Sequence, residues 1–322
     1  MKTVNLFFLS LILAACEPTG KGYSVVHGWP KLPPAFILGQ VAGVEVDSHN
    51  HVFTFHRGKN AAYLGGDSEF ENIQESTILI IDHKTGSLLN SFGEDAFLTP
   101  HGLTVDAENN VWVTDVQYHQ VYKFSHDGEL LMTLGEEKVP GWDETHFDQP
   151  TDVAVAPDGM VYVSDGYGNN RVAVFDSEGK FKFEWGIAGE NDGQFNLPHG
   201  IARDSDGRIY VADRSNSRVQ VFESDGTFVD AWQSEEIGRP WGMAVGADGT
   251  LYVVDGGDPN PMGVQRSRIV RMTLSGEVLD SFGSYGQYDG QMDWPHDVGV
   301  DSEGSVYVGD VHFGMRIQKF VK

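Results

Sequence analysis

Residues 197–222 of the chain read LPHGIARDSDGRIYVADRSNSRVQVF, and the fold can be worked out from this stretch. An apolar segment that opens with Pro-His-Gly leads into an Asp-Gly turn. An alternating aromatic segment that ends in Asp follows, and then a third alternating segment. Alternation with a period of two residues, interrupted by Asp-Gly, is typical of antiparallel strands joined by hairpins. The stretch therefore predicts three consecutive short strands.

The first segment of this stretch occurs six times along the chain. The copies begin at residues 41, 100, 150, 198, 240 and 295, so consecutive copies are 42 to 59 residues apart. In most copies a further Gly turn leads to a fourth strand-like segment, such as FKFEWG (181–186). Four short antiparallel strands per unit are the pattern of a propeller blade. We therefore expect an all-β fold, a six-bladed β-propeller at residues 36–322, and its strand pattern resembles the NHL repeat.

The two ends of the repeat region predict how the ring closes. The last unit stops after its third strand at Phe320, whereas residues 36–39, FILG, match the fourth-strand pattern without belonging to a unit. We expect this N-terminal strand to complete the last blade, which would leave no free strand edge.

The start of the chain has the composition of an export signal. Residues 1–15 hold one early cation and an apolar run, and the small residues before Cys16 resemble a bacterial lipobox. We expect a lipoprotein signal peptide at 1–15 and a lipidated, proline-rich tether at 16–35. An ordinary secretory signal is the alternative. The prediction is a cell-envelope protein, lipid-anchored to a bacterial membrane on its periplasmic or extracellular side, with no other membrane contact.

Composition excludes several classes of protein. The chain has 22 Lys+Arg against 47 Asp+Glu, a net charge of −25, and no basic cluster, so we expect no nucleic-acid partner. Its single cysteine cannot form an internal disulfide or a Cys-based zinc site. We expect a monomer.

One position of the repeat holds candidate metal ligands. The second residue of each first strand is, in order, Ala42, His101, Thr151, His199, Trp241 and His296. Alternate blades would thus present three imidazoles around the axis, and three histidines with an open position commonly hold catalytic zinc. One Pro-His-Gly alone is more often structural, but strict alternation favours a metal site at His101, His199 and His296.

Other side chains are expected at the same end of the propeller. The loops between second and third strands carry Arg57, Tyr167 and Arg214, and cations near a metal suit an anionic substrate. His56, His119 and His312 also lie near this end, where we expect solvated or capping roles. The Asp that ends the second strand in five units is expected to be a structural cap. Whether the insertion at 256–267 is a lid stays open.

Several long stretches resemble one enzyme family. FTFHRG (53–58), PHGLTVDAENNVWVTDVQYHQVYKF (100–124), QPTDVAVAPDGMVYVSDGYGNNRV (149–172) and WPHDVGVDSEGSVYVGDVH (294–312) are similar to peptidyl-α-hydroxyglycine α-amidating lyase. The resemblance runs through all six units. It implies zinc on the three histidines and a structural calcium on the axis, held by the main-chain carbonyls of Val44 and Leu103 and by the Asp297 carboxylate. It also implies Tyr167 as the base and Arg57 and Arg214 as active-site arginines.

The resemblance implies a carbon–nitrogen lyase, which splits a peptide or small molecule ending in α-hydroxyglycine into an amide and glyoxylate. We expect a separate monooxygenase to supply that substrate. Animal members have a disulfide cysteine after the catalytic tyrosine, where this chain has Gly168. Two alternatives stay open: a noncatalytic NHL propeller that binds a partner on the cell envelope, and a lactonase-like metal-dependent hydrolase.

Overall fold

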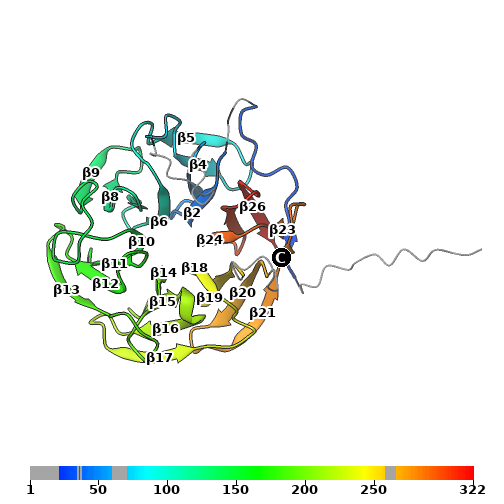
Figure 1. Cartoon of the computed structure of the whole chain (residues 1–322). Coiled ribbons are helices and arrows are strands. Elements are labelled where there is room, and N and C mark those ends of the chain that lie inside the picture. Colours follow the sequence, from blue (N-terminus) through cyan, green and yellow to red (C-terminus); the bar gives the residue numbers. More distant parts are fainter. Residues whose placement is uncertain (1–21, 35, 37, 60–70, 258–265) are drawn as a thin grey trace, which may run out of the picture.

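The computed structural model describes residues 22–34, 36, 38–59, 71–257 and 266–322. Within these residues the chain forms six four-stranded antiparallel sheets arranged around an axis like the blades of a wheel (Figure 1). The prediction of an all-β, six-bladed propeller is confirmed. The expected signal peptide, the first part of the expected tether and most of the 256–267 insertion lie outside the described residues.

The blades follow one another along the chain, each from the axis outward. Blade 1 consists of β2 (Val41–Val46), β3 (His51–His56), β4 (Ile78–Asp82) and β5 (Leu88–Phe92). Blade 2 consists of β6 (Pro100–Val105), β7 (Val111–Asp115), β8 (Gln120–Phe124) and β9 (Leu130–Leu134). Blade 3 consists of β10 (Pro150–Val155), β11 (Val161–Asp165), β12 (Arg171–Phe175) and β13 (Phe181–Trp185).

Blade 4 consists of β14 (Pro198–Arg203), β15 (Ile209–Asp213), β16 (Arg218–Phe222) and β17 (Phe228–Trp232), with the 3₁₀ turn η1 (Arg214–Asn216) after β15. Blade 5 consists of β18 (Pro240–Val245), β19 (Thr250–Asp255), β20 (Arg268–Thr273) and β21 (Val278–Phe282). Blade 6 consists of β24 (Pro295–Val300), β25 (Val306–Asp310) and β26 (Arg316–Val321), and a short pair, β22 (Ser284–Tyr285) and β23 (Gln291–Met292), precedes it. Within the described part no helix is long and apolar enough to cross a membrane.

Blade 6 is closed by an N-terminal strand, as expected, but by a different one. Strand β1 (Ser24–Val25) pairs antiparallel with β26, whereas residues 36–39 were expected in this place. In blades 1 to 5 at least seven residues separate a fourth strand from the next first strand, as between β17 and β18. Only residue 40 lies between residues 36–39 and β2, and a single residue cannot span the distance from an outermost strand to the axis. The folded domain therefore begins within the segment expected to be a tether.

The N-terminal segment is held by aromatic contacts. The ring of Tyr23 stacks on Phe282 with centroids 4.3 Å apart, and its hydroxyl lies 3.2 Å from the hydroxyl of Tyr252. Trp29 is buried against Tyr307. These contacts join the N-terminus to blades 5 and 6, and the ring is closed without a disulfide.

Apolar side chains fill the spaces between neighbouring blades. Phe53, Phe55 and Ile80 of blade 1, for example, pack in one cluster with Leu103 and Val113 of blade 2. The alternation in the sequence sends one face of each inner strand into such a cluster. The blades are thereby held rigidly around the axis, where the first strands meet.

In blades 2 to 6 the Asp at the end of the second strand is a cap, as expected. Asp115 accepts hydrogen bonds from the backbone N–H groups of Leu98, Thr99, Gln117 and Tyr118. In blades 3 to 6 the same Asp also pairs with an Arg at the start of the third strand. These pairs are Asp165–Arg171, Asp213–Arg218, Asp255–Arg268 and Asp310–Arg316, at 2.7 to 3.2 Å.

Candidate metal centre and active site

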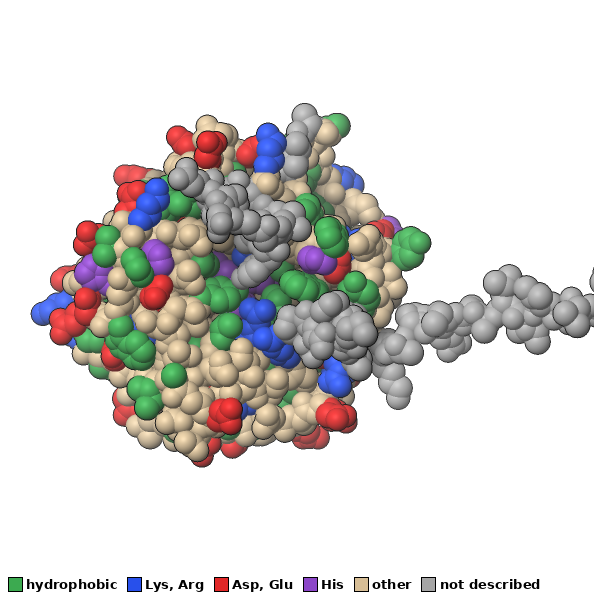
Figure 2. All heavy atoms as spheres, viewed as in Figure 1, with side chains coloured by type: hydrophobic (Ala, Val, Ile, Leu, Met, Phe, Trp, Pro, Cys, Tyr) green, Lys and Arg blue, Asp and Glu red, His purple; other side chains and the backbone are tan. Residues whose placement is uncertain are grey.

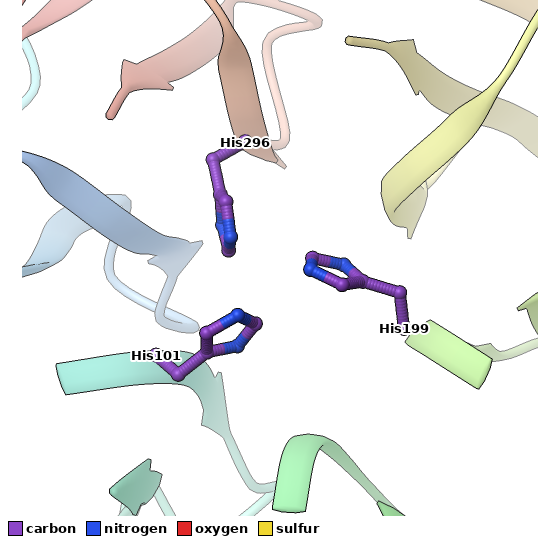
Figure 3. Close-up of side chains that lie close together, drawn as sticks. All are labelled: His101, His199 and His296. Carbon is purple, nitrogen blue, oxygen red and sulfur yellow. The ribbon is translucent and has the colours of Figure 1, made fainter. Parts of the chain in front are cut away.

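The three histidines of alternate blades meet on the axis. Figure 3 shows His101, His199 and His296 pointing toward one another, with ring centroids 4.5 to 4.8 Å apart. Each is the second residue of an innermost strand, β6, β14 or β24, and each is at most 2 % exposed. The strand pairing shifts register directly after these positions, a bulge of the kind that redirects a side chain.

Carbonyl oxygens of the intervening blades orient the three rings. The Nδ1 atoms lie within hydrogen-bond distance of main-chain oxygens, so Nδ1 carries the proton and Nε2 keeps its lone pair. Among the described residues nothing hydrogen-bonds to Nε2 of His296, which is buried. The three contacts are His101 to Thr151 (2.6 Å), His199 to Trp241 (3.1 Å) and His296 to Ala42 (2.7 Å).

The surroundings keep these imidazoles neutral. Burial, together with the charges of Arg57 and Arg214, lowers the pKa of His101 well below its ordinary value. Burial likewise lowers the pKa of His199 and of His296, with smaller effects from the arginines and the neighbouring rings. Neutral imidazole is the form that binds metal, and the ligand atoms of the three residues lie within 4.8 Å of one another. The group therefore could hold a metal ion.

Tyr167 lies directly beside the histidine group. Its hydroxyl oxygen is 3.1 Å from Nε2 of His101 and 3.2 Å from Nε2 of His199, and it accepts a hydrogen bond from Nη1 of Arg214 at 3.3 Å. The residue sits in the loop between β11 and β12, half-buried. The structure thus brings together the tyrosine, one arginine and the histidines that the sequence selected.

The tyrosine loop is held without a disulfide. The backbone N–H of Gly168 donates to the carbonyl oxygen of Asp148, and the side chain of Asn169 donates to Asp165 and to the carbonyl oxygen of Gly141. A Cβ atom at position 168 would lie 2.1 to 2.4 Å from atoms of the Asp148 carboxyl group, so a side chain there would displace the Asp148 side chain. Backbone and side-chain hydrogen bonds therefore hold this loop at Gly168.

The two arginines are buried at the same end of the propeller. Arg57 donates from Nε to the carbonyl oxygen of Pro100 and from Nη1 to Oε1 of Gln40, both at 2.9 Å. The guanidinium of Arg214 lies over the indole of Trp241, 3.4 Å from the ring centroid. In the view of Figure 2, one patch of Lys and Arg side chains lies near the middle of the face, whereas the Asp and Glu side chains and the other Lys and Arg side chains lie mainly around its rim. A positive centre on an acidic protein suits an anionic substrate.

Sequence reasoning missed Gln40 and Trp241 as parts of this site. Gln40 lies before the first strand, outside the repeated segment, so no sequence signal pointed to it. Trp241 occupies in blade 5 the position that histidine holds in blades 4 and 6, and this could have indicated its place in the site. His56 and His119 have the expected capping roles: Nδ1 of His56 accepts from the N–H groups of Gly39 and Gly58, and Nδ1 of His119 accepts from Gln149. His312 instead pairs with Asp293 at 3.0 Å.

A group of acidic side chains lies below the histidines on the axis. Val44, Leu103 and Asp297, the three positions suggested for calcium, line one cavity of about 160 Å³, together with Glu45 and Asp152. Burial raises the pKa of Glu45 to about 7, and burial also raises the pKa of Asp297 well above its ordinary value, with Asp152 adding to the effect. Oδ2 of Asp297 accepts from the Val44 N–H at 2.9 Å.

Asp152 and Glu45 were not selected from the sequence. Asp152 stands in blade 3 at the position held by Asp297 in blade 6, directly across the axis, while the other blades have glycine there. Among the described residues no hydrogen bond satisfies Oδ1 of Asp152, although the atom is buried. Buried carboxylates with an unsatisfied oxygen fit a hard cation such as Ca²⁺.

Known proteins resemble the chain over nearly its whole length. The NHL repeat family model matches residues 147–175 and 195–222. Peptidylglycine alpha-amidating monooxygenase of Rattus norvegicus is 40 % identical over 320 residues, which cover 92 % of the chain and 32 % of the rat protein. Peptidyl-alpha-hydroxyglycine alpha-amidating lyase 2 of Drosophila melanogaster is 30 % identical, covering 92 % of the chain and 75 % of the fly protein. The chain belongs to the peptidyl-α-hydroxyglycine α-amidating lyase family.

The chain spans about a third of the length of the rat relative. Two solved structures of low sequence identity have the same fold as this amidating-lyase family member. A gluconolactonase from Xanthomonas campestris superposes with a TM-score of 0.62 at 13 % identity, covering 94 % of the chain and 96 % of that structure. A streptogramin B lyase superposes with a TM-score of 0.58 at 14 % identity, covering 89 % and 94 %.

Proposed function

We propose that the protein is a zinc-dependent lyase that cleaves a C-terminal α-hydroxyglycine, peptidyl or N-acyl, into an amide and glyoxylate. The observation that carries the proposal is the convergence of three buried, neutral imidazoles with the Tyr167 hydroxyl 3.1 to 3.2 Å from two of their Nε2 atoms. Membership of the amidating-lyase family supports the same reaction class.

Zinc on His101, His199 and His296, when bound, supplies a Lewis acid that makes the α-hydroxyl group of the substrate more acidic. Tyr167 is placed to remove the hydroxyl proton. The Nη1 donor of Arg214 is aimed at the tyrosine oxygen and stabilises the negative charge that this oxygen carries when it acts as a base.

The remaining steps concern the carbon–nitrogen bond. As the hydroxyl oxygen becomes the aldehyde oxygen of glyoxylate, the C–N bond breaks and the departing amide nitrogen takes up a proton. The substrate carboxylate needs a cationic partner, and we assign this role to Arg57 and Arg214. Arg57 is fixed by Pro100 and Gln40, so it is already oriented before the substrate arrives.

We further propose that calcium occupies the axial cavity below the histidines. Asp297 would hold it, together with the main-chain oxygens of Val44 and Leu103. Burial and, second to it, repulsion by Asp152 raise the pKa of Asp297, and a bound cation would stabilise the charged form against both. Its role would be structural, since residues of all six innermost strands line the cavity.

Glyoxylate release from an N-acyl-α-hydroxyglycine by the purified full chain, combined with metal analysis, tests the proposal. Tyr167→Phe should lower kcat by about 10²- to 10⁴-fold while zinc content is retained, because only the base is removed. His199→Ala should lose zinc. Tyr288→Phe, at a tyrosine that is 82 % exposed, is the matched control and should behave as the parent protein.

Absence of both zinc and glyoxylate from the parent protein would refute the proposal. Full retention of zinc by His199→Ala would refute the three-histidine site in particular. The supply of substrate by a separate monooxygenase and the lipid anchor in the cell envelope stay proposals as well. Fractionation of cells, with and without a Cys16→Ala substitution, tests the anchor.

A further inference from the structure

Three histidines gather around one aspartate at the opposite end of blade 1 from the proposed active site. Asp47 follows strand β2, and its Oδ1 accepts the backbone N–H groups of His49 (2.8 Å) and His51 (2.7 Å), which closes the β2–β3 turn. Its other oxygen, Oδ2, faces imidazole nitrogens: Nδ1 of His51 at 3.0 Å, Nε2 of His126 at 3.1 Å and Nδ1 of His49 at 3.7 Å.

Blade 1 departs here from a pattern that three other blades share. Aspartates stand at the position of Asp47 in blades 2, 4 and 6, and in each the Oδ2 atom accepts a hydrogen bond from an aromatic side chain of the second strand. Blade 1 has Phe53 at that position, which has no donor to offer. The other pairs are Asp106 with Trp112 (3.0 Å), Asp204 with Tyr210 (2.9 Å) and Asp301 with Tyr307 (2.7 Å).

The imidazoles exceed what a structural replacement for that donor requires. In blades 4 and 6 one tyrosine hydroxyl donates to Oδ2, and in blade 2 Trp112, Asn110 and Lys123 surround it, none of which is a metal ligand in that form. In blade 1 the groups around Oδ2 are three imidazoles, although the oxygen has only two lone pairs to accept hydrogen bonds. In a tetrahedral zinc site, with bonds of about 2.0 to 2.2 Å, ligand atoms lie about 3.3 Å apart. The three distances to Oδ2 of Asp47 are close to this spacing, and the ligand atoms of Asp47, His49 and His51 all lie within 4.8 Å of one another. His126 meets this group at Oδ2 of Asp47.

We propose that Asp47, His49, His51 and His126 form a second site for a divalent transition-metal ion, separate from the histidine group on the axis. Three imidazoles with one carboxylate favour zinc, nickel or copper over calcium or magnesium. Ala42, which stands at the axial end of β2, is five residues from Asp47, and a strand of that length spans roughly 17 Å. The two sites therefore cannot share an ion.

The position of the site indicates what the ion does. His126 lies in the turn between β8 and β9 of blade 2, whereas the other three ligands belong to the β2–β3 turn of blade 1. A bound ion links two neighbouring blades at the face away from the active site. The Asp47 side chain is fully buried, while His51 and His126 are about one third exposed and His49 is 64 % exposed, so the ion can exchange with solvent.

Zinc titration of the untagged full chain tests this site, with stoichiometry read by equilibrium dialysis. The double variant His51→Asn, His126→Gln places an amide donor where each ring nitrogen now contacts Asp47, so it retains the hydrogen bonds but loses two ligands. We expect it to bind one zinc equivalent fewer than the parent protein, and any residual binding there to be at least about tenfold weaker. Phe53→Tyr, which restores the hydroxyl found in blades 4 and 6, should also weaken this equivalent.

Cobalt titration adds a spectroscopic readout, because tetrahedral Co²⁺ absorbs visible light strongly. His146→Asn, at an imidazole paired with Asp143, is the control and should leave the stoichiometry unchanged. In a His199→Ala background the second equivalent should persist, so failure of the proposed lyase site and failure of this one are distinguishable. Equal zinc stoichiometry and affinity in the parent protein and the folded double variant would overturn the proposal. If the double variant does not fold, the Phe53→Tyr variant is the test instead. A zinc affinity of Phe53→Tyr equal to that of the parent protein would also overturn the proposal.

Discussion

The buried imidazole of His56 makes a quantitative prediction about stability and pH. Its Nδ1 atom accepts the backbone N–H groups of Gly39 and Gly58, and its Nε2 atom donates to the carbonyl oxygen of Ser76. Protonation would place a hydrogen on Nδ1 against two donors. Burial lowers the pKa of His56 from its ordinary value of 6.5 to about 4. Arg57 directly follows His56, so the same hydrogen bonds also hold the segment that carries Arg57.

The size of the effect follows from the pKa difference. The unfolded chain binds a proton near pH 6.5 and the folded protein only near pH 4, so stability is fully present above 6.5 and is lost as the pH falls through this window. Each pKa unit corresponds to about 1.36 kcal/mol, so His56 contributes roughly 3 kcal/mol of pH-dependent stability. The side chain is fully buried, and solvent screening does not reduce this figure much.

His56→Asn isolates this contribution. The Asn oxygen can accept the same backbone N–H groups but does not titrate. At pH 8 the variant should be less stable by about 1 to 2 kcal/mol, through loss of the bond to Ser76 and of packing. By pH 4.5 the stability difference should shift by about 2 to 3 kcal/mol in favour of the variant, so that the variant becomes as stable as the parent protein or more stable.

Urea unfolding in EDTA at several pH values measures this difference, because chelation removes proton-linked metal binding and the other histidines cancel between the two proteins. His27→Asn, at an exposed ring, is the control and should change nothing. Parallel stability curves for the parent protein and His56→Asn from pH 8 to 4.5 would refute the reasoning.

Three further predictions give independent checks. Arg171→Met leaves the fully buried Asp165 without its partner and should destabilise the fold by about 3 to 5 kcal/mol in urea unfolding, whereas Lys182→Met, in an exposed pair, should cost under about 1 kcal/mol. Calcium should raise the Tm more at pH 7.5 than at pH 5, because carboxyl groups with a raised pKa are protonated at the lower pH; Asp297→Asn should abolish this gain. Arg214→Lys loses the planar stack on Trp241 and the bond to Tyr167, and should lower kcat/KM for glyoxylate release about 10- to 150-fold.

The blade pattern could be predicted because it is repeated, whereas the closing strand could not. Alternating strands recur in every unit and Asp-Gly turns recur in blades 2 to 5, so an ambiguous copy can be interpreted from the others. The closing strand occurs once, and β1 pairs through only Ser24 and Val25, too short to show alternation. Residues 36–39 matched the fourth-strand pattern better, and only the distance from an outer strand to the axis excludes them.

In the candidate site, too, residues at repeated positions could be predicted from the sequence, whereas single residues could not. His101, His199 and His296 were visible because they alternate at one repeated position. Asp152 and Gln40 were not, since a single Asp or Gln in a repeat carries no pattern until the axis brings it beside Asp297 or Arg57. The His49, His51 and His126 group was missed because its third member lies 75 residues from the second in the sequence.

Alternation has a physical basis that the sequence pattern only hints at. Each imidazole is oriented by a carbonyl oxygen of the following blade, so every histidine position requires a neighbour that contributes its backbone. That neighbour must also keep its side chain out of the centre. Ala42 is small, Thr151 turns its hydroxyl to Ser164 and Pro198, and Trp241 lies against Arg214. Six blades therefore yield three ligands and three supports, and the backbone sets which nitrogen of each ring faces the axis.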